Sequence, residues 1–336
     1  MRTDVRVRSA NGKASTGRTY IGRGLNRRPT RPGREDHCVC DRRGSSLLVS
    51  LLISWFAFTS AVTTSAQATI PLDEISPALA TRLQAQIERG SSEEKRTALS
   101  EIRNLRSPSA SRIALPALRD KNELVRATAA ASVIFLPSNE AASALVPLLN
   151  DRAEFVRREA AYALGDAGHP SATVPLVGLI RTDKVLEVRT AATVALGKIG
   201  DTAAVGSLLA VLRSRPREED EFLRRSAARA IGQIAQIKET SDRSVVTPQN
   251  FLPDKFKEIG PGNSRPRPTE FSAAVDVLIN VLRSSAESDD TRREAAFALG
   301  AIGDEKAVPT LQNFVSNDDP YMKEIAREAL DRKSVV

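Results

Sequence analysis

A ten-residue pattern that recurs along the chain is the feature that most constrains its fold. It reads Val-Arg-Arg-Glu-Ala-Ala-Tyr-Ala-Leu-Gly at residues 156–165 and Val-Arg-Thr-Ala-Ala-Thr-Val-Ala-Leu-Gly at residues 188–197. Successive copies begin 31, 32, 35, 68 and 31 residues apart, at Val125, Val156, Val188, Leu223, Thr291 and Met322. A fixed period of this length is typical of a solenoid, in which each repeat stacks on the next.

Each repeat is expected to contain two antiparallel helices. In the second helix Val156, Ala160, Ala163, Leu164 and Ala167 form one apolar stripe at helical spacing. The first helix often contains proline, which a helix tolerates only near its start, so it should begin or bend there. The sequence predicts an all-α solenoid, a right-handed superhelix of about seven antiparallel helix pairs. The expected pairs span residues 74–105, 108–136, 139–167, 170–200, 202–236, 271–303 and 304–333.

Glycines near the ends of the second helices are expected to take the left-handed conformation that ends a helix. They are Gly165, Gly168, Gly197, Gly200, Gly300 and Gly303. Ser76 before Pro77 predicts the start of the first helix.

The net charge of +8 does not belong to the repeats. Residues 1–43 hold twelve Lys and Arg against four Asp and Glu, whereas the chain from Thr69 onward holds 37 of each sign. We therefore expect no nucleic-acid binding by the repeats. Both cysteines, Cys38 and Cys40, also lie in the leader, and their spacing lacks the second ligand pair of a zinc site. No metal and no cofactor is expected.

The N-terminal part resembles an export signal preceded by a basic leader. Residues 1–41 lack apolar periodicity and should be disordered. Residues 42–68 contain Arg42-Arg43, an apolar run and Ala66-Gln67-Ala68, which predict a signal peptide cleaved after Ala68. Because this signal-like segment lies so far from Met1, we expect translation to start downstream of Met1. A membrane anchor is the alternative, although the run is short for a spanning helix, so we expect a periplasmic or secreted protein without stable membrane insertion.

An insertion at about 237–270 interrupts the repeat domain, which spans 69–336. It contains five prolines, and it carries a local aromatic cluster, Phe251 and Phe256, with Phe271 just beyond. A connection this long is usually functional or disordered. These three phenylalanines are predicted partner-binding residues, and a tolerated surface excursion is the alternative.

The recurring pattern resembles HEAT repeats, more particularly the HEAT-like repeats of phycobilisome lyases. In that family an acidic residue six positions before the arginine pairs with it. The resemblance implies a structural ladder of Asp120/Arg126, Asp151/Arg157, Asp183/Arg189 and Glu218/Arg224. Asn317/Lys323 is a weakened version, and Ala286/Arg292 departs from the pattern.

A search for catalytic motifs favours a protein without enzymatic activity. Deoxyhypusine hydroxylase, built of similar repeats, needs several His-Glu pairs to hold iron, but only His169 follows the leader here. We therefore predict no catalytic residues and an exported scaffold that binds a protein or peptide. The alternatives are a bilin-lyase-like accessory factor or enzyme with a small ligand in its groove, and an envelope-associated structural protein.

Overall fold

The computed structural model describes residues 75–240 and 269–334. The predicted leader, the predicted signal peptide and residues 241–268 of the insertion lie outside the described residues. Within the described ranges the chain is helical and contains no strand. None of its helices combines the length and the apolar character needed to cross a membrane.

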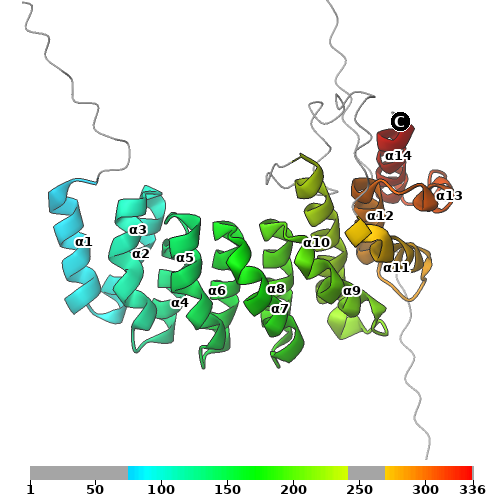
Figure 1. Ribbon diagram of the computed structural model, residues 1–336. Helices are drawn as coiled ribbons and strands as arrows, with labels where there is room; N and C mark the ends of the chain where they lie inside the picture. The colour runs from blue at the N-terminus through cyan, green and yellow to red at the C-terminus, as the bar shows by residue number, and fades with distance from the viewer. Residues whose placement is uncertain (1–74, 241–268, 335–336) are drawn as a thin grey trace, which may run out of the picture. The chain divides into compact units, whose positions relative to one another are not determined.

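Seven helix pairs follow one another in the part of the chain that the structure describes, as predicted (Figure 1). The first helices are α1 (Pro77–Arg89), α3 (Pro108–Ala114), α5 (Ser138–Leu145), α7 (Thr173–Thr182), α9 (Val205–Arg213), α11 (Ser272–Arg283) and α13 (Val308–Gln312). The second helices are α2 (Ser92–Leu105), α4 (Glu123–Ser132), α6 (Glu154–Ala167), α8 (Leu186–Ile199), α10 (Glu221–Thr240), α12 (Asp289–Ile302) and α14 (Pro320–Ser334).

Short 3-10 segments extend or precede several of these helices. They are η1 (Leu115–Arg119), η2 (Val146–Asn150), η3 (Pro170–Ala172), η4 (Thr202–Ala204), η5 (Glu218–Asp220), η7 (Thr269–Phe271) and η8 (Glu305–Ala307). Pro116 and Pro147 lie at the starts of η1 and η2, which agrees with the prediction that a helical segment begins or bends at these prolines. Helix α10 runs to Thr240, which places the start of the insertion four residues later than predicted.

The N-terminal cap of α1 forms as predicted. The Ser76 hydroxyl accepts a hydrogen bond from the backbone N–H of Leu79 at 3.3 Å, and Pro77 is the first helical residue. Serine in this position satisfies one of the backbone donors that the first turn leaves unpaired.

The second helices pack directly against one another, α2 on α4 and so on to α12 on α14. Their contact surfaces consist largely of alanine, and the buried side chains of all pairs form one continuous core. Gly165 in α6 permits a close approach, because a Cβ there would lie 2.8 Å from the Cα of Ala195 in α8. Small residues therefore set the short distance between consecutive second helices.

The glycines divide into two groups, which corrects the sequence prediction. Gly168, Gly200 and Gly303 end their helices with φ values of 67°, 78° and 72°, as expected of left-handed C-caps. The other three, Gly165, Gly197 and Gly300, have no positive φ and lie inside their helices. The prediction that they end helices was wrong, because close helix contact rather than a turn requires glycine there.

Candidate functional site

A ladder of arginine side chains joins neighbouring helix pairs at the turns between first and second helices. Arg157, in the first turn of α6, donates from Nε and Nη2 to the two carboxylate oxygens of Asp183, at 2.7 and 3.0 Å. Its Nη1 donates to the backbone carbonyl oxygen of Asp151 at 2.9 Å. Arg126 binds the Asp151 carboxylate at 2.7 and 2.8 Å and the carbonyl oxygen of Asp120 at 2.8 Å. Each guanidinium thus holds the turn of its own pair and the turn of the next.

This geometry corrects the predicted pairing of Asp120/Arg126, Asp151/Arg157, Asp183/Arg189 and Glu218/Arg224. Acid and arginine of one helix pair do not share an ion pair through their side chains, and each arginine reaches the acid of the following pair. The cause lies in the turn. The Asp151 carboxylate accepts the backbone N–H of Ala153 at 2.9 Å while it binds Arg126, and only its carbonyl oxygen faces Arg157.

The aspartates of the ladder are held in their ionised form. Burial alone would raise the pKa of Asp183, but hydrogen bonds from Arg157 and from the Val185 N–H outweigh it and leave the pKa below its ordinary value of 3.8. The pKa of Asp151 is lowered in the same way. Burial raises it, but hydrogen bonds from Arg126 and from the Ala153 N–H outweigh the effect of burial. These two rungs therefore remain charged pairs at neutral pH.

Replacing Arg157 by alanine should cost about 2–3 kcal/mol of unfolding free energy, because it leaves the Asp183 carboxylate, 4% exposed, without its cation. Since the folded pKa of Asp183 is lowered, its contribution is present above the unfolded pKa near 3.8 and is lost as the pH falls through the folded value. In urea titrations, the difference in unfolding free energy between wild type and variant should be smaller at pH 3 than at pH 7. An equal difference at both pH values would contradict this ion pair.

The ladder is incomplete at Arg189. Its Nη2 lies 3.9 Å from Oδ1 of Asp220, beyond hydrogen-bond distance, and its Nε is buried without a hydrogen-bond partner. The cause is a longer turn in the next helix pair, where α9 is followed by Ser214 instead of an aspartate and the acid Asp220 comes six residues later. The sequence predicted Glu218 as the acid in this turn. That was wrong, since Glu218 is exposed and Asp220 faces Arg189.

The following rung is the most buried. Arg224 is 2% exposed, and it pairs through Nε and Nη2 with the carboxylate of Glu287 before α12, with an Nε to Oε2 distance of 3.0 Å. The same guanidinium donates to the carbonyl oxygens of Val211, Leu212 and Ser214 at 2.8, 2.9 and 2.8 Å. It therefore ties α10 to α9 of its own pair and to the following helix pair.

A cavity of about 830 Å³ opens at the incomplete rung. Its walls come from the end of α7, from α9 and the turn that follows it, and from the starts of α8 and α10. Seven of its fifteen lining residues are charged, namely Arg181, Arg189, Arg215, Arg217, Arg224, Glu219 and Asp220. The sequence did not predict this site, because it depends on the length of one turn.

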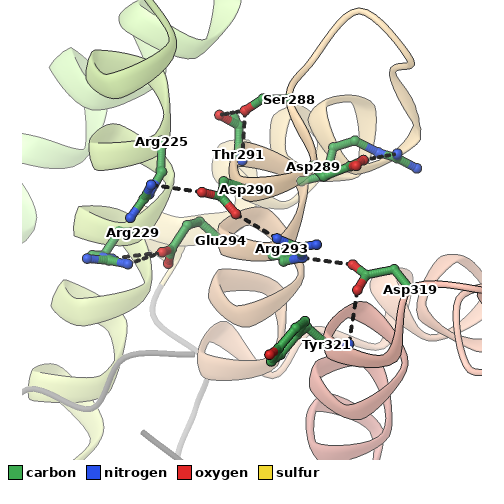
Figure 2. A network of polar contacts seen from close by, with 11 residues as sticks. Arg225, Arg229, Ser288, Asp289, Asp290, Thr291, Arg293, Glu294, Asp319 and Tyr321 are labelled. Carbon is green, nitrogen blue, oxygen red and sulfur yellow. Dashed lines mark hydrogen bonds and ion pairs between the residues drawn. The ribbon is translucent and has the colours of Figure 1, made fainter. Parts of the chain in front are cut away.

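A chain of ion pairs crosses the second helices further along the array (Figure 2). Arg225 of α10 binds Asp290 of α12 at 2.9 Å, and Asp290 binds Arg293 of the same helix at 2.6 Å. Arg293 then donates to Asp319, before α14, at 2.7 Å. In this unit the sequence lacks the acid six residues before Arg292, and the contact to the next helix pair is made by Arg293 instead.

The network also contains a buried carboxylate. Glu294 of α12 is 2% exposed and accepts from Nε of Arg229 of α10 at 2.8 Å, a contact drawn in Figure 2. Its second oxygen, Oε2, is buried without a hydrogen-bond partner. Burial raises the pKa of Glu294 and outweighs the opposite effect of Arg229.

Exposed apolar side chains occupy one repeated position at the starts of the second helices. Leu124, Phe222 and Tyr321 are the second residues of α4, α10 and α14 and are 43%, 68% and 66% exposed. Phe155 holds the same position in α6, but it is only partly exposed and packs against the core, and the guanidinium carbon of Arg158 lies 4.9 Å from its ring centroid. Because the second helices stack on one another, these positions lie at the same end of each helix. We call Leu124, Phe155, Phe222 and Tyr321 the apolar row.

The predicted partner-binding phenylalanines do not form a site in the described residues. Phe271 is 3% exposed and belongs to the core, so its predicted role in partner binding was wrong. Phe251 and Phe256 lie outside the described residues. His169 hydrogen-bonds through Nδ1 to the Ser171 hydroxyl at 2.8 Å and caps η3. Across 75–240 and 269–334 there is no group of three or more His, Cys, Asp or Glu that could hold a metal ion.

Comparisons with known proteins agree with this architecture. A deoxyhypusine hydroxylase from Candida albicans is 40% identical over 57 residues, which cover 17% of this chain and 18% of that protein. The alpha subunit of phycocyanobilin lyase from Nostoc sp. is 43% identical over 65 residues, 18% of this chain and 24% of that protein. The chain therefore matches less than a quarter of the length of either relative.

Among solved structures, the complex of CpcE and CpcF of phycocyanin lyase from Nostoc sp. PCC7120 is similar, with 22% identity and a TM-score of 0.41. The match covers 76% of this chain and 87% of that chain. The family profile of HEAT repeats matches residues 79–165, 148–231 and 270–332, more than half of the chain. Because this profile covers more than half of the chain, the chain belongs to the HEAT-repeat family.

Proposed function

We propose that this protein is a scaffold that holds another protein or peptide along the apolar row. The observation that carries the proposal is the recurrence of Leu124, Phe155, Phe222 and Tyr321 at one position of the repeat. An exposed apolar side chain by itself needs no explanation. A row of them at the same end of stacked helices forms a surface that a partner can follow from one repeat to the next.

The composition of the row also fits a protein partner. Aromatic side chains are enriched at the centres of protein interfaces, where truncating one often costs about 2 kcal/mol of binding free energy. In α8 and α12 the same position is acidic, with Glu187 and Asp290, so the row offers apolar contacts separated by charges. Such alternation favours a specific partner over general hydrophobic adsorption.

The proposal extends to the location and the chemistry of the protein. We propose that the chain is exported, on the basis of the signal-like residues 42–68 and the cleavage pattern that ends at Ala68. We also propose that it is not an enzyme. The cavity lining contains arginine, serine, acidic and aliphatic side chains, with no histidine or cysteine that could serve as a nucleophile or base near neutral pH.

A peptide selection tests the docking function. Dodecamer peptides are selected from a random phage library on the immobilised full chain, and the affinities of the selected peptides are measured by fluorescence polarisation. Replacing Phe222 by serine should weaken these peptides about 30-fold, because the loss of one aromatic anchor costs about 2 kcal/mol.

The matched control is Val174→Ser. Val174 is 77% exposed but lies on the first helix α7, away from the apolar row, so its replacement should leave peptide affinity unchanged. Peptides that bind the Phe222→Ser protein as tightly as wild type, or a library that yields no binding peptide, would count against the docking function.

A further inference from the structure

The cavity at the incomplete rung contains an arginine with an unused donor edge. We propose that this cavity binds a carboxylate side chain of the partner that docks on the apolar row, an inference that rests on the function proposed above. The ligand class is a glutamate or aspartate side chain of a peptide, held by the guanidinium of Arg189.

The chain itself shows what this donor edge binds elsewhere. In Arg126, Arg157 and Arg224 the edge formed by Nε and Nη2 donates to both oxygens of one carboxylate. In Arg189 the same edge has a buried Nε without a partner and an Nη2 at 3.9 Å from Asp220. A buried donor without an acceptor is costly, and a planar carboxylate is the acceptor that fits two parallel N–H groups. The site therefore lacks one carboxylate.

The charges around the cavity favour an anion. Two of the five lining arginines are already neutralised, Arg217 by Glu219 at 3.4 Å and Arg224 by Glu287. Besides Glu219, the only acid in the cavity lining is Asp220, which lies 3.9 Å from Arg189. Among the described residues, Arg181 and Arg215, which are exposed, form no ion pair with any acid. An entering carboxylate would thus meet an excess of positive charge.

The remaining lining residues suit the methylene groups of an acidic side chain. Ile180, Leu186 and Leu223 give the cavity an apolar part beside its arginines. The cavity also lies where a docked partner would pass, since Leu186 and Leu223 adjoin Glu187 and Phe222, the α8 and α10 members of the repeated position that defines the apolar row. A peptide anchored on Phe222 can therefore place an acidic residue in the cavity.

A titration with glutarate tests the site directly. The full chain carries ¹⁵N-labelled arginine, and the Nε–H resonance of Arg189 is identified by its absence in Arg189→Gln. Glutarate should shift this resonance saturably, and it should bind Arg189→Gln about tenfold more weakly or not at all, because a bidentate charged contact is lost. Arg152→Gln is the matched control, since Arg152 is exposed on the equivalent turn before α6 but does not line the cavity.

A second cavity variant and a competing anion complete this test. Arg215 is exposed and lines the cavity, so Arg215→Gln should fold normally and weaken glutarate about two- to threefold through lost attraction. Inorganic phosphate serves as the competing probe. A saturable shift with phosphate but none with glutarate would overturn the assignment of a carboxylate ligand, as would the absence of any shift.

The library peptides separate this inference from the docking function. Changing the acidic residue of a selected peptide to its amide should weaken binding to wild type about tenfold and leave binding to Arg189→Gln unchanged. Peptides that depend on Phe222 but not on Arg189 would overturn the carboxylate site and leave the docking function intact. Glutarate binding without any dependence of peptides on Phe222 would remove the docking function and keep the site.

Discussion

Replacing Arg224 by alanine is expected to lower the free energy of unfolding by about 3–5 kcal/mol, the largest loss among the arginines of the ladder. The substitution leaves the carboxylate of Glu287, 4% exposed, without its cation inside the protein. It also removes the donors to the carbonyl oxygens of Val211, Leu212 and Ser214, which lie at the end of α9. Urea titrations followed by circular dichroism at neutral pH measure the loss.

Arg189→Ala is the matched control for this prediction. It removes the same side chain from the equivalent position of the neighbouring helix pair, where the ion pair with Asp220 spans 3.9 Å, and it should cost less than about 1 kcal/mol. The double variant Arg224→Met/Glu287→Met should recover much of the loss, because it leaves no buried charge unpaired. Equal losses for Arg224→Ala and Arg189→Ala would refute the ranking of the two rungs.

Gly165→Ala should destabilise the protein by about 1–3 kcal/mol although it adds a single methyl group. The new Cβ would lie 2.8 Å from the Cα and 3.0 Å from the Cβ of Ala195, so α6 and α8 must move apart. Backbone atoms cannot rotate away as a flexible side chain can, and the interior packs closely enough to transmit the displacement to neighbouring helices. Thermal and urea unfolding of the purified variant give the magnitude.

The same substitution at Gly178 should have the opposite sign. Gly178 lies inside α7, and no atom comes within 4 Å of an added Cβ apart from its own helix backbone and chain neighbours. Alanine there should stabilise the helix by about 0.5–1 kcal/mol through reduced backbone entropy in the unfolded chain. If both variants gained stability, the close contact between α6 and α8 would not limit residue size at Gly165.

Most of the fold could be predicted because it depends on local repetition. The period of the Val-Arg pattern, the apolar stripe around Val156 and the prolines of the first helices predicted the order of the pairs and most of their bounds. These signals lie within one repeat, and the principles of helix amphipathicity and capping read them directly.

The partners of the arginines could not be predicted from the period. Asp151 lies six residues before Arg157 and Asp183 lies 26 residues after it, and both relations recur in neighbouring repeats. A repeat length near 31 residues therefore makes the two pairings equivalent in the sequence. Only the direction of the carboxylate in the turn decides between them.

The candidate site was hidden for a different reason. Phe271 attracted attention as an aromatic residue near an irregular segment, yet it fills the core. The apolar row could have been found by aligning the copies at the residue before the Val-Arg pair, where Leu124, Phe155, Phe222 and Tyr321 recur. The cavity at Arg189 has no such signal, because it follows from a turn that carries its acid at Asp220 instead of directly after α9.

Because each ladder arginine binds the acid of the following helix pair, the array has a direction. Between Arg126 and Asp183 each unit offers one guanidinium to its successor and one carboxylate to its predecessor. Duplicating or deleting a whole unit in this stretch adds or removes one arginine and one aspartate together, so no buried charge is left unpaired. The chain can therefore change its length by whole repeats at little electrostatic cost, whereas a break inside a unit separates the two.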